Sequence, residues 1–131
     1  MQPKKILLAE DDHDDSNLFH EYLKGREDIV LMPTAENGIE VIKFLDKIVE
    51  HTDLPDLIIL DQNMPKKNGK QTLVFLKSNN RFAHIPVIVY STYTDDQLIK
   101  DCTKKGASMV VSKPLTNKGY HDMMDGFLKV L

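Results

Sequence analysis

Polar side chains that could do chemistry follow four short apolar runs of this sequence. They are Glu10-Asp11-Asp12, Asp61-Gln62-Asn63, Ser91-Thr92 and Ser112-Lys113-Pro114. Carboxylate oxygens, waters and phosphate oxygens are the ligands that Mg²⁺ prefers. A nearby lysine and hydroxyl group would neutralise and hydrogen-bond a phosphoryl group, and a carboxylate can itself accept that group as a nucleophile. If the fold brings these residues together, they indicate Mg²⁺-dependent phosphoryl chemistry.

Asp61 raises the sharpest question, because the apolar run in LIILDQNMP (residues 57–65) leads straight into a carboxylate. An ionised carboxylate is costly next to a core unless a charged group compensates it. Asp61 therefore either caps the following loop or lies at the mouth of a site that needs its charge.

Each set of polar residues also has an ordinary structural interpretation. Glu10, Asp11 and Asp12 could cap the next helix, and Asp12 is our candidate for that role. Lys113-Pro114 alone would be a turn with a solvated lysine, and Ser91 alone a polar strand end. Their joint placement after four strands favours a shared site.

The elements that must position these residues are predicted from the hydrophobic pattern. Five apolar runs are too short for helices and predict strands buried on both faces. They are Ile6–Ala9, Ile29–Met32, Leu57–Leu60, Val87–Tyr90 and Met109–Val111. Between and after them, apolar residues at helical spacing predict five helices. The stripes are Leu18-Phe19-Tyr22-Leu23, Ile42-Leu45-Val49, Leu73-Leu76, Leu98-Cys102 and Tyr120-Met124-Phe127-Leu131.

Five strand–helix alternations predict an α/β fold with a doubly wound, five-stranded parallel sheet. Sites in such sheets form outside the carboxyl ends of the strands. If the first and third strands are neighbours, Glu10, Asp11 and Asp61 converge there. The last helix is predicted to end near Leu131, so we expect residues 1–131 to form a single domain.

Composition narrows the function classes. The chain has 131 residues, of which 41% are hydrophobic and 28% charged, with a formal net charge of −3. No lysine or arginine block suggests direct nucleic-acid binding, and no apolar run approaches the roughly 20 residues needed to span a bilayer. The N-terminal apolar run is too short for a signal peptide, and the lone Cys102 cannot form an internal disulfide. We therefore expect a cytoplasmic protein without membrane insertion, in which Cys102 packs in the core.

The segments ILLAEDD, LIILDQNMPKKNG, PVIVYST and GASMVVSKP resemble the receiver domain of two-component response regulators. The resemblance covers essentially the whole chain. It implies the flavodoxin-like fold with strand order 2-1-3-4-5. It also implies that Asp61 accepts a phosphoryl group from a histidine kinase or a histidine phosphotransfer protein, with Mg²⁺ as cofactor.

The resemblance also implies roles for single residues. Glu10 and Asp11 match the acidic pair, Asp61 shares the Mg²⁺, and Asn63 offers its main-chain carbonyl to the metal. Ser91 matches the Ser/Thr position of the family.

In the last of these segments, GASMVVSKP, Lys113 matches the family's lysine, and the Lys113–Pro114 peptide bond is expected to be cis. Gly69 matches the glycine that ends the loop after the phosphorylation site.

Two positions depart from the family pattern. Val110 replaces the switch aromatic three residues before the lysine, so we expect the response to concentrate in the Ser91–Thr94 loop, with Tyr93 or Tyr90 as possible substitutes. Tyr93 also occupies a position that influences dephosphorylation, where it cannot orient an attacking water as an acid or amide could.

Three functions compete. The first is a stand-alone phosphorylatable receiver that signals by docking to an unknown target protein, without an output domain and without enzyme activity beyond its own phosphorylation and slow autodephosphorylation. The second is a receiver-like binding module that is never phosphorylated. The third is an aspartyl-phosphate phosphatase, which needs an aspartate two residues after the nucleophile. That position is Asn63.

Overall fold

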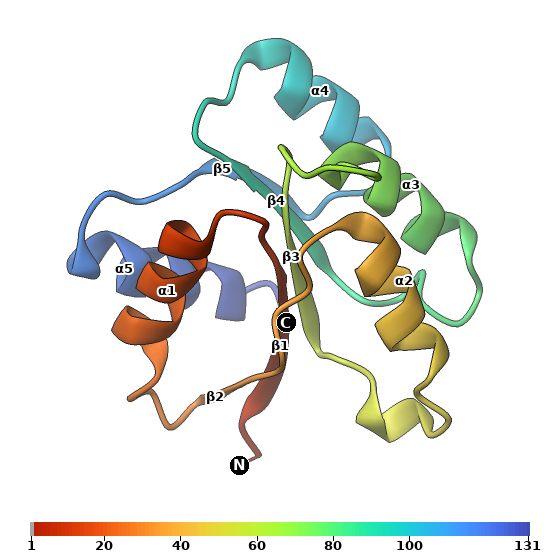
Figure 1. The fold of residues 1–131 in the computed structure, drawn as a ribbon, viewed down its shortest axis with the longest axis horizontal. Helices are drawn as coiled ribbons and strands as arrows, with labels where there is room; N and C mark the ends of the chain where they lie inside the picture. Colours follow the sequence, from red (N-terminus) through yellow and green to blue (C-terminus); the bar gives the residue numbers. More distant parts are fainter. Residues whose placement is uncertain (1) are drawn as a thin grey trace.

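A computed structural model describes residues 2–131, in which strands and helices alternate along the chain (Figure 1). The elements are β1 (Lys4–Ala9), α1 (His13–Leu23), β2 (Ile29–Leu31), α2 (Gly38–Asp46), β3 (Leu57–Asp61), α3 (Gly69–Ser78), β4 (Val87–Ser91), α4 (Asp96–Lys104), β5 (Met109–Ser112) and α5 (Asn117–Leu128). A single 3₁₀ turn, His51–Asp53, lies between α2 and β3. All strand pairs are parallel, and the sheet order is β2-β1-β3-β4-β5. The predicted flavodoxin-like topology is confirmed.

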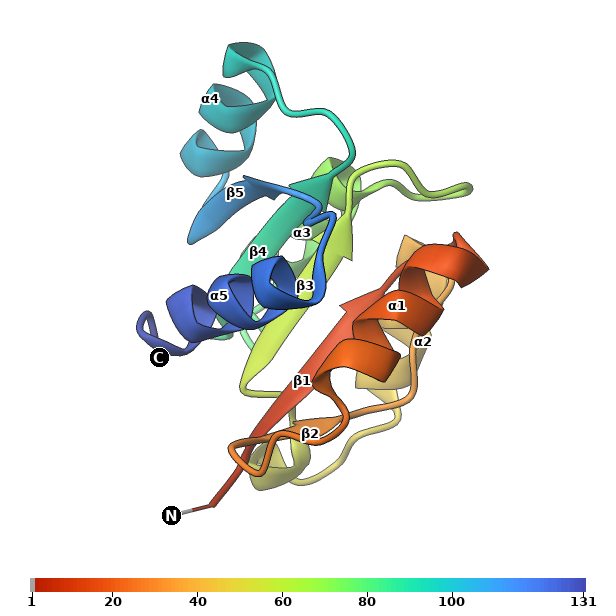
Figure 2. The same ribbon diagram turned by 90° about the vertical axis from the view of Figure 1, so that its left-hand side faces the viewer.

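Helices cover both faces of the sheet. Helices α1 and α5 lie side by side on one face, and α2, α3 and α4 lie on the other (Figures 1 and 2). None of the helices within residues 2–131 is long and apolar enough to cross a membrane.

Each helix begins after a residue whose side chain accepts a hydrogen bond from the first turn. These capping residues are Asp12, Asn37, Asn68, Asp95 and Thr116. Such caps satisfy main-chain N–H groups that have no partner inside the helix, and each typically contributes about 1 kcal/mol. The prediction that Asp12 caps the first helix is confirmed.

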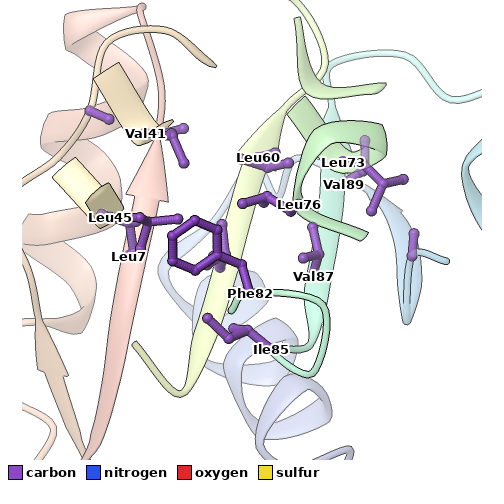
Figure 3. Close-up of a cluster of buried hydrophobic side chains, with 14 of the residues drawn as sticks. Leu7, Val41, Leu45, Leu60, Leu73, Leu76, Phe82, Ile85, Val87 and Val89 are labelled. Atoms are coloured by element: carbon purple, nitrogen blue, oxygen red, sulfur yellow. The ribbon is translucent and has the colours of Figure 1, made fainter. Parts of the chain in front are cut away.

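The strands alternate their side chains between two hydrophobic clusters because successive residues point to opposite faces. Leu7, Leu60, Val87 and Val89 face α2 and α3, where Figure 3 shows them around Phe82. Cys102 of α4 is fully buried in the same cluster, as predicted.

The cluster under α1 and α5 uses the alternate residues of the same strands. It contains Ile6, Leu8, Phe19, Leu23, Ile29, Leu57, Ile59, Ile88, Tyr90, Tyr120, Met124 and Phe127. This alternation decides which strand-end side chains share the face of α1 and α5.

Two details of the predicted pattern are wrong. All five strands were predicted to be buried on both faces, but β2 and β5 are only partly buried, because each lies at an edge of the sheet with a neighbouring strand on one side only. Val49 and Leu131 do not belong to the predicted helical stripes, because α2 ends at Asp46 and α5 at Leu128, and the two residues are 86% and 39% exposed.

Candidate functional site

Strand alternation carries four polar groups to the face of α1 and α5. Glu10 follows Leu8 by two residues, Asp61 follows Ile59, Tyr90 follows Ile88, and Lys113 follows Val111. In each case the apolar residue lies in, or packs against, the cluster under α1 and α5. The polar residues extend these rows to the carboxyl ends of the strands. A polar site therefore lies directly on top of this hydrophobic cluster.

Three carboxylates converge at this point. Glu10, Asp11 and Asp61 each offer one oxygen, and the three oxygens lie within 4.8 Å of one another. They meet because β1 and β3 are adjacent, with Ala9 paired to Leu60 in the register. The predicted convergence is confirmed.

Lys113 is the compensating cation. Its Nζ atom lies 2.8 Å from Glu10 Oε1, 2.8 Å from Asp15 Oδ2 and 3.3 Å from Asp61 Oδ2. Only 9% of its side chain is exposed. One buried ammonium group therefore links β1, α1 and β3 to the end of β5.

Two members of this network were not predicted as site residues, although Tyr90 was expected as a possible substitute for the switch aromatic. Asp15, in the first turn of α1, contacts Lys113. The Tyr90 hydroxyl donates a hydrogen bond of 2.6 Å to Glu10 Oε1. A usable signal existed for Tyr90, because it stands in β4 with the same parity as Ile88 and directly before Ser91.

Crowding of charge shifts the protonation of the site. Burial, and then the hydrogen bond and negative charge of Glu10, raise the pKa of Asp61 far above its ordinary value. Burial alone would also raise the pKa of Glu10, but hydrogen bonds with Asp61 and Lys113 lower it overall. Hydrogen bonds with Asp15 and Glu10 likewise outweigh burial and raise the pKa of Lys113. The single ammonium group of Lys113 therefore does not fully compensate the negative charge around Asp61.

The loop after β3 folds back closely onto Asp61. The Asn63 N–H donates to Asp61 Oδ1 at 3.2 Å, and the Gly69 N–H donates to the Gln62 carbonyl at 3.2 Å. A Cβ atom on Gly69 would lie 2.7 Å from the Asp61 carbonyl oxygen and 3.0 Å from Gln62 Cα. Gly69 thus permits a close main-chain approach that a side chain would prevent.

An open cavity of about 550 Å³ leads to the acids. Asp11, Asp61, Asn63, Thr92 and Lys113 are among its lining residues.

Ser91 does not line this cavity. It is 2% exposed at the end of β4, and its Oγ atom accepts a hydrogen bond of 3.4 Å from the Tyr93 N–H. Ser91 has the parity of Val89, which belongs to the opposite cluster. Ser91 therefore lies at the predicted edge of the sheet, but it is not among the residues that line the cavity over the acids.

Other predictions meet mixed outcomes. The Lys113–Pro114 peptide bond is trans, as are all peptide bonds of the described chain, so the prediction of a cis bond is wrong. Val110 packs against the cluster under α2 and α3, and Tyr93 is 74% exposed.

The donor set fits a hard divalent cation. Asp11 and Asp61 combine ionisable oxygens with access from the cavity, and Glu10 lies behind them. A cation here would relieve the repulsion that raises the pKa of Asp61. These residues could hold a metal ion.

Comparison with known proteins agrees with this geometry. The sequence model of the family "response regulator receiver domain" matches residues 6–125. Response regulator Rcp1 of Synechocystis sp. is 38% identical over 100 residues, which cover 74% of this chain and 68% of Rcp1. The polar-differentiation response regulator DivK of Brucella anthropi is 28% identical over 131 residues, which cover 96% of this chain and 97% of DivK.

Solved structures give the same result. The Mn²⁺-bound form of Rcp1 has a TM-score of 0.79 at 32% identity and covers 95% of this chain and 91% of its own. The phosphorylated cyanobacterial phytochrome response regulator RcpA has a TM-score of 0.81 at 30% identity, with the same coverage. The first similar structure contains a divalent metal and the second is phosphorylated.

Proposed function

This chain belongs to the response regulator receiver domain family, and on that premise we propose that it is a phosphorylatable receiver whose Asp61 accepts a phosphoryl group. The donor is the phosphohistidine of a sensor histidine kinase or of a histidine phosphotransfer protein. Residues 1–131 act as one receiver domain and signal by docking to a target protein. The observation that carries the proposal is the convergence of Glu10, Asp11 and Asp61 around Lys113.

In this proposal Glu10, Asp11, Asp61 and the main-chain carbonyl of Asn63 would hold Mg²⁺. When bound there, the metal would supply positive charge close to the phosphoryl group. The Mn²⁺-bound structure of Rcp1 supports a divalent cation at this kind of site.

The side chains of this chain perform the rest of the chemistry. A carboxylate oxygen of Asp61 attacks the phosphorus atom while the bond to the donor nitrogen breaks. Lys113, already 3.3 Å from Asp61, turns from Glu10 and Asp15 toward a phosphoryl oxygen. The Asn63 N–H, which now donates to Asp61 Oδ1, keeps the attacking carboxylate oriented.

Ser91 must change its partner to take part. Its hydroxyl oxygen accepts from the Tyr93 N–H and lies outside the cavity, whereas Thr92 lines it. We propose that phosphorylation draws the Ser91–Thr94 loop toward Asp61, so that Ser91 donates to the phosphoryl group. This movement is the conformational signal.

A phosphatase function is the weaker alternative. It requires a general acid or base two residues after the nucleophile, and Asn63 has no ionisable side chain. We propose no enzyme activity beyond Asp61 phosphorylation and its slow hydrolysis.

Intact-mass measurement after incubation with a small acyl phosphate tests the proposal. Wild-type protein should gain one phosphoryl group with Mg²⁺ and none with a chelator. Asp61→Asn should gain none, whereas Asp56→Asn, on the loop before β3, should behave as wild type. Modification that persists in Asp61→Asn, or that ignores the chelator, would assign the chemistry elsewhere.

A further inference from the structure

Tyr90 is the one aromatic side chain among the described residues that contacts both charged partners of Asp61. Its hydroxyl donates to Glu10 Oε1 at 2.6 Å, and its ring lies under Lys113, with Nζ 5.0 Å from the ring centroid. Lys113 Nζ itself lies 2.8 Å from Glu10 Oε1. The three side chains form a closed set of contacts, and Tyr90 is only 1% exposed.

The sheet register holds Tyr90 in this position. Tyr90 is paired with Asp61 across β3 and β4, so the two side chains leave the sheet on the same face. Val111 is its partner on β5, two residues before Lys113. The phenol ring is therefore the last apolar layer beneath the acids, with its polar tip inside the site.

We propose that Tyr90 is a positioning residue of the acidic site, whose hydroxyl group fixes the Glu10 carboxylate and whose ring supports the Lys113 ammonium group. This inference rests on the proposed function, because it concerns how Glu10 is presented to the cation.

The contacts of Glu10 explain the effect. Oε1 accepts from both Tyr90 and Lys113, and Oε2 accepts from the Asp12 N–H at 3.3 Å. A carboxylate held on both oxygens loses less freedom when a cation binds. During phosphorylation Lys113 turns toward the phosphoryl group, and Tyr90 then remains the side-chain donor that holds Glu10. Outer partners of metal ligands typically change metal affinity by about 10- to 100-fold when they are mutated.

Tyr90→Phe tests the inference because it removes only the hydroxyl oxygen. We expect Mg²⁺ binding, followed by amide chemical shifts, to weaken about tenfold. Saturating Mg²⁺ should restore most of the phosphorylation rate, because Asp61, Ser91 and Lys113 remain. The matched control is Tyr120→Phe, since Tyr120 is 2% exposed in the same cluster and makes no side-chain hydrogen bond within residues 2–131. The control should bind Mg²⁺ as wild type does.

Equal Mg²⁺ affinity in Tyr90→Phe and wild type, or equal losses in both phenylalanine variants, would overturn the inference while leaving the proposed function intact. Wild-type protein that neither binds Mg²⁺ nor gains a phosphoryl group would overturn both.

A measurement on wild-type protein covers the case in which Tyr90→Phe fails to fold. The buried hydroxyl proton of Tyr90 should give a slowly exchanging downfield resonance, because it lies in a short hydrogen bond to a carboxylate. That resonance should shift when Mg²⁺ is added. A resonance that is unchanged by Mg²⁺ would show that Glu10 and Tyr90 do not respond to the cation together, and would overturn the inference.

Discussion

The Lys113 Nζ atom lies 3.3 Å from Asp61 Oδ2 while it contacts Glu10 and Asp15 at 2.8 Å each. One buried ammonium group is therefore shared by three carboxylates from three different elements. This arrangement leaves the site with excess negative charge, and several consequences can be measured.

Lys113→Ala should destabilise the metal-free protein, because it leaves buried carboxylates without their counter-charge. We expect the free energy of unfolding in chelator to fall by about 3–5 kcal/mol. The variant should still fold and bind Mg²⁺, yet fail to transmit phosphorylation to a partner. Denaturant titration with and without Mg²⁺ measures the first effect, and Lys118→Ala, whose side chain is 85% exposed, is the control. A Lys113→Ala chain that stays unfolded in saturating Mg²⁺ would show that this lysine is mainly a structural counter-charge.

Asp61→Asn should stabilise the metal-free protein. The pKa of Asp61 is raised in the folded state, so its contribution to stability is present at low pH and is lost as pH rises through that raised pKa. Asparagine removes this penalty, and we expect a gain of about 1–3 kcal/mol near neutral pH. The difference between the two proteins should widen from about pH 4 to about pH 8 in chelator, the interval between the ordinary and the raised pKa of Asp61.

Asp101→Asn is a control in which the pKa of the replaced carboxyl group is shifted in the opposite direction. Lys70 lowers the pKa of Asp101, so this carboxylate contributes stability above its unfolded pKa. Asparagine should therefore give no gain at neutral pH. If Asp61→Asn and Asp101→Asn change the free energy of unfolding equally across this pH range, the ionised Asp61 carboxylate does not destabilise the folded protein.

Mg²⁺ affinity should rise with pH. Because the pKa of Asp61 is raised, part of the metal-free protein carries a proton there that must leave when the carboxylate becomes a ligand. We expect tighter binding at about pH 8 than at about pH 6. Calorimetry in two buffers with different ionisation heats would detect the released proton. Binding heats that do not depend on the buffer would argue against a protonated Asp61.

Gly69→Ala should disturb the loop after Asp61. The new Cβ atom would meet the Asp61 carbonyl oxygen at 2.7 Å, and the main chain must move to relieve this contact. We expect a loss of about 1–3 kcal/mol in unfolding free energy and slower phosphorylation. Gly126→Ala in α5 is the control, because nothing lies within 4 Å of its new Cβ. It should be neutral or gain roughly 0.5–1 kcal/mol.

Val110→Ala should leave the response to phosphorylation largely intact. Val110 is small, is restricted at χ1 by its branched Cβ and packs against the cluster under α2 and α3, so it cannot turn as an aromatic ring would. Amide chemical shifts with and without beryllium fluoride should change most in the Ser91–Thr94 loop. Loss of this response in Val110→Ala, or changes in β5 as large as those in the Ser91–Thr94 loop, would contradict the prediction.

A hydrogen bond between two hydroxyl groups connects the Ser91–Thr94 loop to β5. Thr94 Oγ1 and Ser112 Oγ lie 2.9 Å apart. Thr94→Val should therefore reduce chemical-shift changes at Ser112 more than those at Thr92. Changes at Ser112 that are as large in Thr94→Val as in wild type would show that another contact carries the signal.

The order of elements and the edge that carries the site were predictable from the sequence. Apolar runs and helical stripes are local patterns, and their alternation permits few topologies. The carboxyl ends of parallel strands share one edge of the sheet, and Glu10, Asp11 and Asp61 converge there once the first and third strands are neighbours.

Contacts between distant residues were decided only by the tertiary structure. Tyr90 and Glu10 are separated by 80 positions and Lys113 and Asp15 by 98, so no local pattern relates them. The tertiary structure also places the Tyr90 hydroxyl on Glu10, whereas Ser91, the next residue, does not line the cavity. The trans Lys113–Pro114 bond and the early end of α2 before Val49 also differ from expectation. Residue types predicted the chemistry of the site, but three-dimensional packing determined which side chains contact one another, because hydrogen bonds and charge pairs depend on distance in space and not on separation along the chain.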